Sequence, residues 1–203
     1  MEIVTLAERI KSGEYEAVSV EELCKEAAEF FSRAMESEAG KRYKQGIEYC
    51  VAAYEDLDAA YENSNDCENF EQGKKRVADM QKRVKFHEHR IKADMYITEK
   101  RYYMLLDEIL AAKSLYRELL EDNDENIEDF ESKFSPYICD LGRLERAARD
   151  RIKNMYQLPG EVQLKNKRDR LDIALNRAVA EERYEDAARF RDKIKKLEGS
   201  LCV

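Results

Sequence analysis

Apolar residues recur at helical spacing along most of this chain. Ser19 followed by Glu22 forms a capping box, because the hydroxyl and the carboxylate can each satisfy an amide at a helix start. Two apolar stripes follow, separated by residues 36–40, and they predict two helices packed lengthwise. The polar residues 63–66 are expected to end the second helix. The stripes consist of Val20, Leu23, Ala27, Phe30 and Ala34, and then Tyr43, Ile47, Cys50, Tyr54, Leu57 and Tyr61.

A third stripe occupies residues 77–119 and predicts one long helix over about 70–121. A continuous helix of that length would extend about 80 Å at 1.5 Å per residue, so we expect an elongated protein. The stripe departs from strict alternation only where His87, Ile91 and Met95 make two successive steps of four. This departure locally unwinds the seam and predicts a bend there.

The remaining chain divides at Pro159-Gly160, its only Pro-Gly step and the best candidate boundary. Before it, Ser135-Pro136 combines a good N-cap with the residue best suited to a first helical position, so another helix should start there. We therefore expect a helical bundle at residues 1–157 and a separate unit at 158–203. In the second unit, residues 164–198 predict two short amphipathic helices, a hairpin with too little core to be stable without a partner.

Composition supports an all-α fold. Seven Gly and two Pro leave too few turn residues for a many-stranded sheet, and charged residues make up 39% of the chain. No uncharged stretch approaches the length of a signal sequence or a membrane span, so we expect a cytoplasmic protein that makes no membrane contact. The five cysteines form an odd set without a Cys-x-x-Cys pair, which favours reduced thiols over disulfides or a zinc ribbon.

The net charge of −8 hides blocks of opposite sign. Residues 1–73 carry 18 acids and 7 bases, whereas residues 74–101 carry 10 bases and 4 acids. Residues 102–142 are acidic again and residues 143–196 are basic. Such blocks attract one another when helices fold back, which is the interpretation we favour. The alternative is that the basic block at 74–101 contacts a phosphate backbone.

Candidate catalytic and metal chemistry is sparse. His87 and His89 are the only histidines and point to nearly opposite faces of a helix, so they cannot share a metal ion unaided. His87 lies in the apolar stripe and is expected to be a core residue. No glycine cluster for phosphate and no Gly-x-Ser-x-Gly nucleophile is present, so we expect no enzyme activity, no cofactor and no metal site. Cys50 is expected to act as a small apolar residue.

The stretch LDIALNRAVAEERYEDAARFRDKIKKL, from Leu171 to Leu197, resembles the UVR motif. This helical hairpin occurs in UvrB, in UvrC and in Clp-associated proteins such as McsA and ClpC. The resemblance rests on Tyr-Glu, Ala-Ala and Arg-Asp at offsets that amphipathicity alone does not require. Glu182-Arg183 is more similar to the Clp-associated versions, although the zinc-binding cysteine pairs of McsA are absent. Residues 1–157 carry no helicase or nuclease signature.

The resemblance implies protein–protein contact through the hairpin and no catalysis. The expected partner is another UVR hairpin, a Clp ATPase or an excision-repair protein. We therefore expect an adaptor or regulator, in which the N-terminal bundle brings a second protein or holds a homodimer. Two alternatives stay open: a nucleic-acid-associated repair accessory that uses residues 74–101, and a self-associating structural coil. The expected contact residues are Leu171, Leu175, Tyr184, Glu185, Ala187, Ala188, Arg191, Asp192, Ile194 and Leu197.

Overall fold

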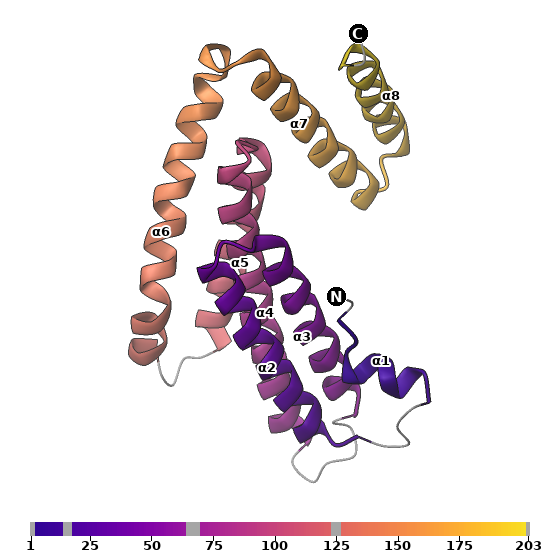
Figure 1. The fold of residues 1–203 in the computed structure, drawn as a ribbon, viewed down its shortest axis with the longest axis vertical. Helices are drawn as coiled ribbons and strands as arrows, with labels where there is room; N and C mark the ends of the chain where they lie inside the picture. Colours follow the sequence, from indigo (N-terminus) through magenta and orange to yellow (C-terminus); the bar gives the residue numbers. More distant parts are fainter. Residues whose placement is uncertain (1–2, 14–17, 64–69, 123–126, 202–203) are drawn as a thin grey trace.

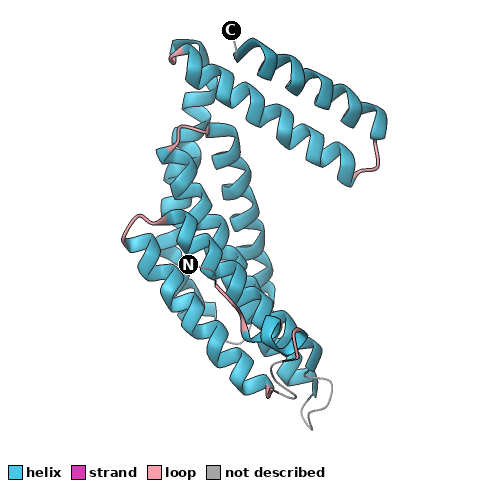
Figure 2. Cartoon of the chain, turned by 45° about the vertical axis from the view of Figure 1, so that its right-hand side comes forward, coloured by secondary structure: helices cyan, strands magenta, loops and turns pink. Residues whose placement is uncertain are grey.

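The computed structural model describes residues 3–13, 18–63, 70–122 and 127–201. Over these ranges the chain forms eight α-helices, one 3-10 turn and no strand, so the predicted all-α fold is confirmed (Figures 1 and 2). No helix in these ranges is both long enough and apolar enough to cross a membrane. The helices are α1 (Leu6–Lys11), α2 (Val20–Ala39), α3 (Tyr43–Asn63), α4 (Phe70–Thr98), α5 (Tyr102–Asp122), α6 (Ile127–Lys153), α7 (Gly160–Ala180) and α8 (Tyr184–Leu201).

The predicted capping box starts α2. The Ser19 hydroxyl accepts the Glu22 N–H at 3.2 Å, and the Glu22 carboxylate accepts the Ser19 N–H at 2.9 Å. α2 then packs against α3 along the predicted seam. The two helices approach closely at Gly46, where a Cβ atom would lie 3.2 Å from the Ala34 carbonyl oxygen. The polar run at 63–66 lies outside the described residues from residue 64 onward, and α3 ends at Asn63.

The long helix predicted over 70–121 is wrong, because the chain reverses at residues 99–101. The double step of four from His87 to Met95, where a bend was predicted, lies inside α4, which continues without interruption to Thr98. Lys100 adopts a left-handed conformation with φ 59°. The Arg101 N–H donates to the Tyr96 carbonyl at 2.9 Å, which closes the end of α4. α5 therefore packs back along α4, and the heptad stripe continues through two antiparallel helices in place of one.

The same turn occurs three times in the fold. At each turn one residue with positive φ is followed by Arg and then by the Tyr that begins the next helix. In all three turns the backbone N–H of the Arg donates to the backbone carbonyl five residues earlier, at 2.7, 2.9 and 2.8 Å. The helix pairs α2–α3, α4–α5 and α7–α8 are therefore hairpins of one construction. The three turns are Lys41-Arg42-Tyr43, Lys100-Arg101-Tyr102 and Glu182-Arg183-Tyr184.

The predicted helix start at Ser135-Pro136 is wrong, because α6 begins at Ile127 and contains Pro136 in its interior. An interior proline removes one backbone hydrogen bond and crowds the preceding turn, at a cost of about 3 kcal/mol. Packing of the same helix opposes this cost, since Phe134, Leu141 and Ala148 are all buried. Proline commonly starts a helix, but here Pro136 is tolerated within α6, where it lies on an exposed side of the helix.

α4 lies between two apolar cores. Val84 and Ile91 belong to a cluster with α2 and α3, whereas Phe86 and Ala93 belong to a cluster with α5 and α6. Phe86 is completely buried, although it lies outside the predicted stripe. One stripe identifies one buried face, and a helix that is covered on two sides needs a second face. His87 is buried as expected, with the Phe86 and Tyr137 rings edge-on at 5.2 Å each. Burial lowers its pKa to about 3.

The opposite-sign blocks pair with each other, as expected. Lys82 of α4 forms an ion pair with Asp122 of α5, and Arg90 of α4 forms one with Glu38 of α2. Glu88 is buried and neutralised by Lys92 of the same helix at 2.6 Å.

The Cys50 side chain is fully buried in the first core, and burial raises the pKa of its thiol to about 12, which agrees with an apolar role.

Candidate partner-binding hairpin

α7 and α8 form a helical hairpin at the C-terminal end of the protein. Figures 1 and 2 show α7 leaving the end of α6 and extending away from the bundle, with α8 returning beside it. Glu185 and Asp186 lie in the first turn of α8, where their charge complements the helix dipole. The interior of the hairpin is small. Its buried apolar side chains in the described residues are Ala178 of α7 and Ala187 and Ile194 of α8.

Asn166 attaches α7 to the turn between α4 and α5. Its Oδ1 accepts the Tyr102 N–H at 2.6 Å, which is one of the amides left unpaired at the start of α5. Its Nδ2 donates to the Lys100 carbonyl at 2.8 Å and to the Val162 carbonyl at 2.9 Å. Asn166 is completely buried and thereby satisfies backbone groups of two helices at once.

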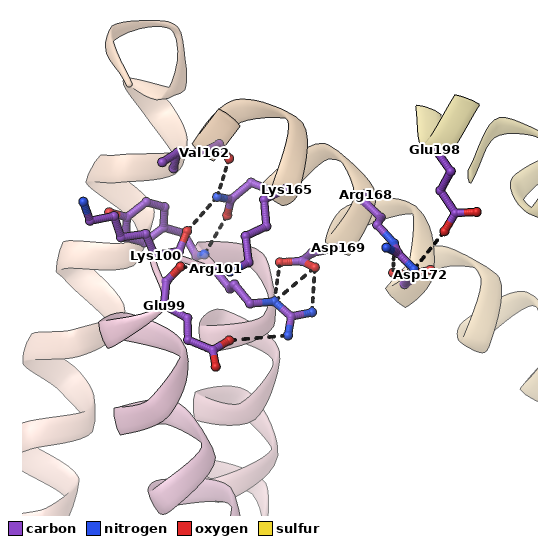
Figure 3. A network of polar contacts seen from close by, with 11 residues as sticks. Glu99, Lys100, Arg101, Val162, Lys165, Arg168, Asp169, Asp172 and Glu198 are labelled. Carbon is purple, nitrogen blue, oxygen red and sulfur yellow. Dashed lines mark hydrogen bonds and ion pairs between the residues drawn. The ribbon is translucent and has the colours of Figure 1, made fainter. Parts of the chain in front are cut away.

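Asp169, one turn further along α7, holds the same turn through Arg101. The Arg101 guanidinium donates to Asp169 at 2.7 Å through one nitrogen and at 3.0 Å through another, a fork geometry that fixes orientation (Figure 3). Asp169 is 2% exposed, so this ion pair is largely shielded from water on the Asp169 side. Arg101 also stacks on the Tyr96 ring at 4.9 Å. The hairpin is therefore held to the bundle by polar side chains near the start of α7.

The structure divides the ten predicted contact residues into three groups. Ala187 and Ile194 are buried inside the hairpin, and Leu171, Leu175 and Leu197 are half-buried. Tyr184 is 67% exposed although it begins α8 next to an apolar interior. The exposed group consists of Tyr184, Glu185, Ala188, Arg191 and Asp192.

Tyr184 and Ala188 are one helical turn apart, so they share one face of α8, which we call the tip face. Val179, near the end of α7, is also 48% exposed. An exposed tyrosine beside a small residue is a surface on which another helix can pack closely, since alanine leaves room for its backbone. Arg183 lies beside this face and donates to Glu181 at 2.8 Å and to Asp186 at 2.7 Å, contacts that raise the pKa of its guanidinium.

Sequence reasoning missed the attachment residues Asn166 and Asp169. In the sequence they look like ordinary solvent-facing positions among Lys167, Arg168 and Arg170. Asn166 and Asp169 are three residues apart and therefore lie on one face of a helix. This spacing is the sequence feature that could have indicated a shared contact. The partner groups lie at the α4–α5 turn, however, and that turn was predicted to be the interior of a long helix.

The described residues contain no group of three or more His, Cys, Asp or Glu side chains positioned to hold a metal ion. His89 and Glu108 contact each other at 2.5 Å and connect α4 to α5. The surface of the hairpin carries exposed aromatic and small apolar side chains together with charged ones.

No curated protein and no solved structure matches the chain significantly. A match is found with the family described as the UvrB/UvrC motif, and it covers residues 165–200. The matched range comprises most of α7 and nearly all of α8, including Asn166 and Asp169. The C-terminal hairpin therefore matches the UvrB/UvrC motif, the UVR motif that the sequence pattern indicated.

Proposed function

We propose that this protein is a non-enzymatic adaptor or regulator that docks on a partner protein through its UVR hairpin. The observation that carries the proposal is the tip face: Tyr184 is 67% exposed, with Ala188 exposed one turn later on the same side of α8. The hairpin has a small apolar interior, and this large aromatic side chain remains exposed to water on its surface. Such a side chain is typical of the centre of a protein–protein contact.

The attachment of the hairpin supports this role. Asn166 and Asp169 hold the start of α7 against the α4–α5 turn, and the hairpin then projects from the bundle (Figure 1). A projecting element with a fixed base presents its surface with little loss of conformational freedom on binding. The partner is another UVR hairpin, a Clp ATPase or an excision-repair protein, the classes that the motif implies. Residues 1–157 then bring a second protein or hold a homodimer.

The nucleic-acid alternative is less well supported. Much of the basic block at 74–101 is neutralised within the protein, so few of its charges are available to phosphate groups. Lys82, Arg90 and Arg101 pair with Asp122, Glu38 and Asp169, and Lys85 and Lys92 both pair with Glu88. Lys85 in addition lies 4.4 Å from the centre of the Tyr54 ring.

The test is a substitution on the tip face of the full-length chain, Ala188→Glu. It should abolish capture of the main partner from native lysate, read by mass spectrometry, because a carboxylate would have to be desolvated at the contact. Ala147→Glu is the matched control, since Ala147 is an exposed alanine of α6. Circular dichroism of both variants should match the unmodified protein.

Recovery of the same partners with Ala188→Glu as with Ala147→Glu would contradict the proposed docking face. A Clp ATPase or an excision-repair protein that is lost only with Ala188→Glu would identify the pathway. Binding should also change little between low and moderate salt, because apolar contacts release few counterions, whereas phosphate contacts weaken steeply. A steep salt dependence would favour the nucleic-acid alternative.

A further inference from the structure

A groove between α7 and α8 lies on a side of the hairpin that the tip-face residues do not line. Its volume is about 640 Å³. The floor is apolar and half-buried, so the hairpin by itself leaves it partly in contact with water. The apolar lining residues are Leu171, Ala174, Phe190 and Leu197, and the basic ones are Lys167, Arg170, Lys193 and Lys196.

The charge of this groove is of one sign. In the described part of the chain, none of its four basic side chains forms an ion pair or a hydrogen bond, and only Lys193 makes a ring contact, with Phe190 at 5.6 Å. The bases of the bundle differ, since many of them meet a carboxylate. The four charges therefore add up to a positive field over an apolar floor.

Outside the groove, the hairpin neutralises a basic side chain with nearby carboxylates. Arg168 of α7 donates to Glu198 of α8 at 2.9 Å and lies 3.7 Å from Asp172, so an ion-pair network crosses from one helix to the other (Figure 3). Burial raises the pKa of the Asp172 carboxyl despite this arginine. None of the three residues lines the groove. The hairpin thus forms ion pairs around Arg168, whereas the four basic side chains of the groove form none in the described residues.

We propose that this groove binds an acidic amphipathic helix of a partner protein. Apolar side chains of that helix would cover Leu171 and Phe190, while flanking Asp and Glu side chains would meet Lys167, Arg170, Lys193 and Lys196. A phosphate backbone would satisfy the charges and leave the apolar floor exposed, so a protein helix fits both parts. The inference rests on the proposed docking function and adds a second surface with its own partner chemistry.

The test is a display selection on the full-length protein. The library consists of 20-residue helical peptides with Leu fixed at one-face spacing and all flanking positions varied. Selected peptides should be enriched in Asp and Glu at the flanking positions. In fluorescence anisotropy they should bind Arg170→Glu/Lys193→Glu at least about tenfold more weakly than the unmodified protein, because rim charges of the wrong sign repel the ligand.

The matched control is Arg146→Glu/Lys195→Glu, which makes the same charge change at exposed residues outside the groove. Selected peptides should bind this control as they bind the unmodified protein, and they should also bind Ala188→Glu. The groove proposal would be overturned if the selected peptides were not enriched in Asp and Glu at the flanking positions. It would also be overturned if the groove variant and the control variant weakened peptide binding equally. Tighter binding of a 20-nucleotide single strand than of any peptide would overturn it in favour of nucleic acid.

The two proposals fail separately in these experiments. Loss of the lysate partner with Ala188→Glu, together with peptides that ignore the groove charges, would retain the docking function and remove the groove. Peptides that depend on Arg170 and Lys193, together with a lysate partner that ignores Ala188, would retain the groove and remove the tip face. Circular dichroism of each variant excludes loss of folding as the cause.

Discussion

Arg101 and Asp169 join the two parts of this protein through a forked hydrogen-bonded ion pair. Arg101 occupies the turn between α4 and α5, and Asp169 lies in the first half of α7, inside the matched UVR range. Because Asp169 is 2% exposed, it has no access to solvent that could replace the guanidinium. Together with Asn166, the pair therefore holds the start of α7 against the α4–α5 turn of the bundle.

Replacing Arg101 by Gln should loosen this attachment. Removal of one partner leaves a buried carboxylate without a counter-charge, which costs about 2–4 kcal/mol. Urea unfolding followed by circular dichroism measures the loss, and small-angle scattering should show a wider range of hairpin orientations. The double variant Arg101→Gln/Asp169→Asn should recover part of the stability, because it no longer buries an unpaired charge.

The exposed pair Arg168–Glu198 supplies the comparison for this prediction. Both side chains are almost half exposed, at 48% and 46%, so Glu198→Gln should change stability by less than about 1 kcal/mol. Equal effects of Arg101→Gln and Glu198→Gln on unfolding and on scattering would mean that the Arg101 pair has no special role in orienting the hairpin.

Asn166→Ala should weaken the start of α5 as well as the attachment of α7. The substitution leaves the buried Tyr102 N–H and the Lys100 carbonyl without their partner, at a cost of about 1–3 kcal/mol. Hydrogen exchange at the Tyr102 amide should become faster by the corresponding factor. Asn166→Asp, which keeps the acceptor but loses both donors, should protect this amide more than Asn166→Ala does. Unchanged exchange in the alanine variant would disprove the capping role.

Asp56 should make the protein less stable as pH rises from about 4 to about 6. The Asp56 carboxylate accepts the Ala7 N–H at 2.9 Å, while its other oxygen has no hydrogen-bond partner in the described residues. Burial raises the pKa of Asp56 to about 6 from 3.8, with smaller contributions from Glu26 and Glu55. The folded state therefore holds a proton that the unfolded state releases in this range. The free energy of unfolding falls accordingly, by up to about 3 kcal/mol from this residue.

The Asp56→Asn variant tests this linkage because its amide oxygen can still accept the Ala7 N–H without titrating. Relative to the unmodified protein, its free energy of unfolding should rise by about 2 kcal/mol between pH 4.5 and pH 7. Urea titrations at the two pH values measure this difference, and other titrating groups cancel in it. Parallel pH profiles of the two proteins would show that Asp56 does not titrate in this way.

Local regularities in the sequence determined much of this protein. The period of the apolar residues predicted helices and most of their buried side chains, because a helix repeats its faces whatever surrounds it. Ser19 and Glu22 predicted a helix start correctly, since a capping box needs only residues three positions apart. The UVR pattern in α8 was recognisable for the same reason: its defining residues lie within one short hairpin.

The tertiary structure decided where the chain reverses and what the hairpin contacts. Lys100 ends α4 through a left-handed turn that carries no glycine, so the helical period continues across it without a visible break. Phe86 is buried only because α4 is covered on a second side, and Pro136 stays within α6 although proline more often starts a helix. Asn166 and Asp169 find their partners around Arg101, far away in the sequence, and only the folded chain brings those groups together. Spacing within a helix is a local property, whereas the partner of a buried polar group depends on the packing of the whole molecule.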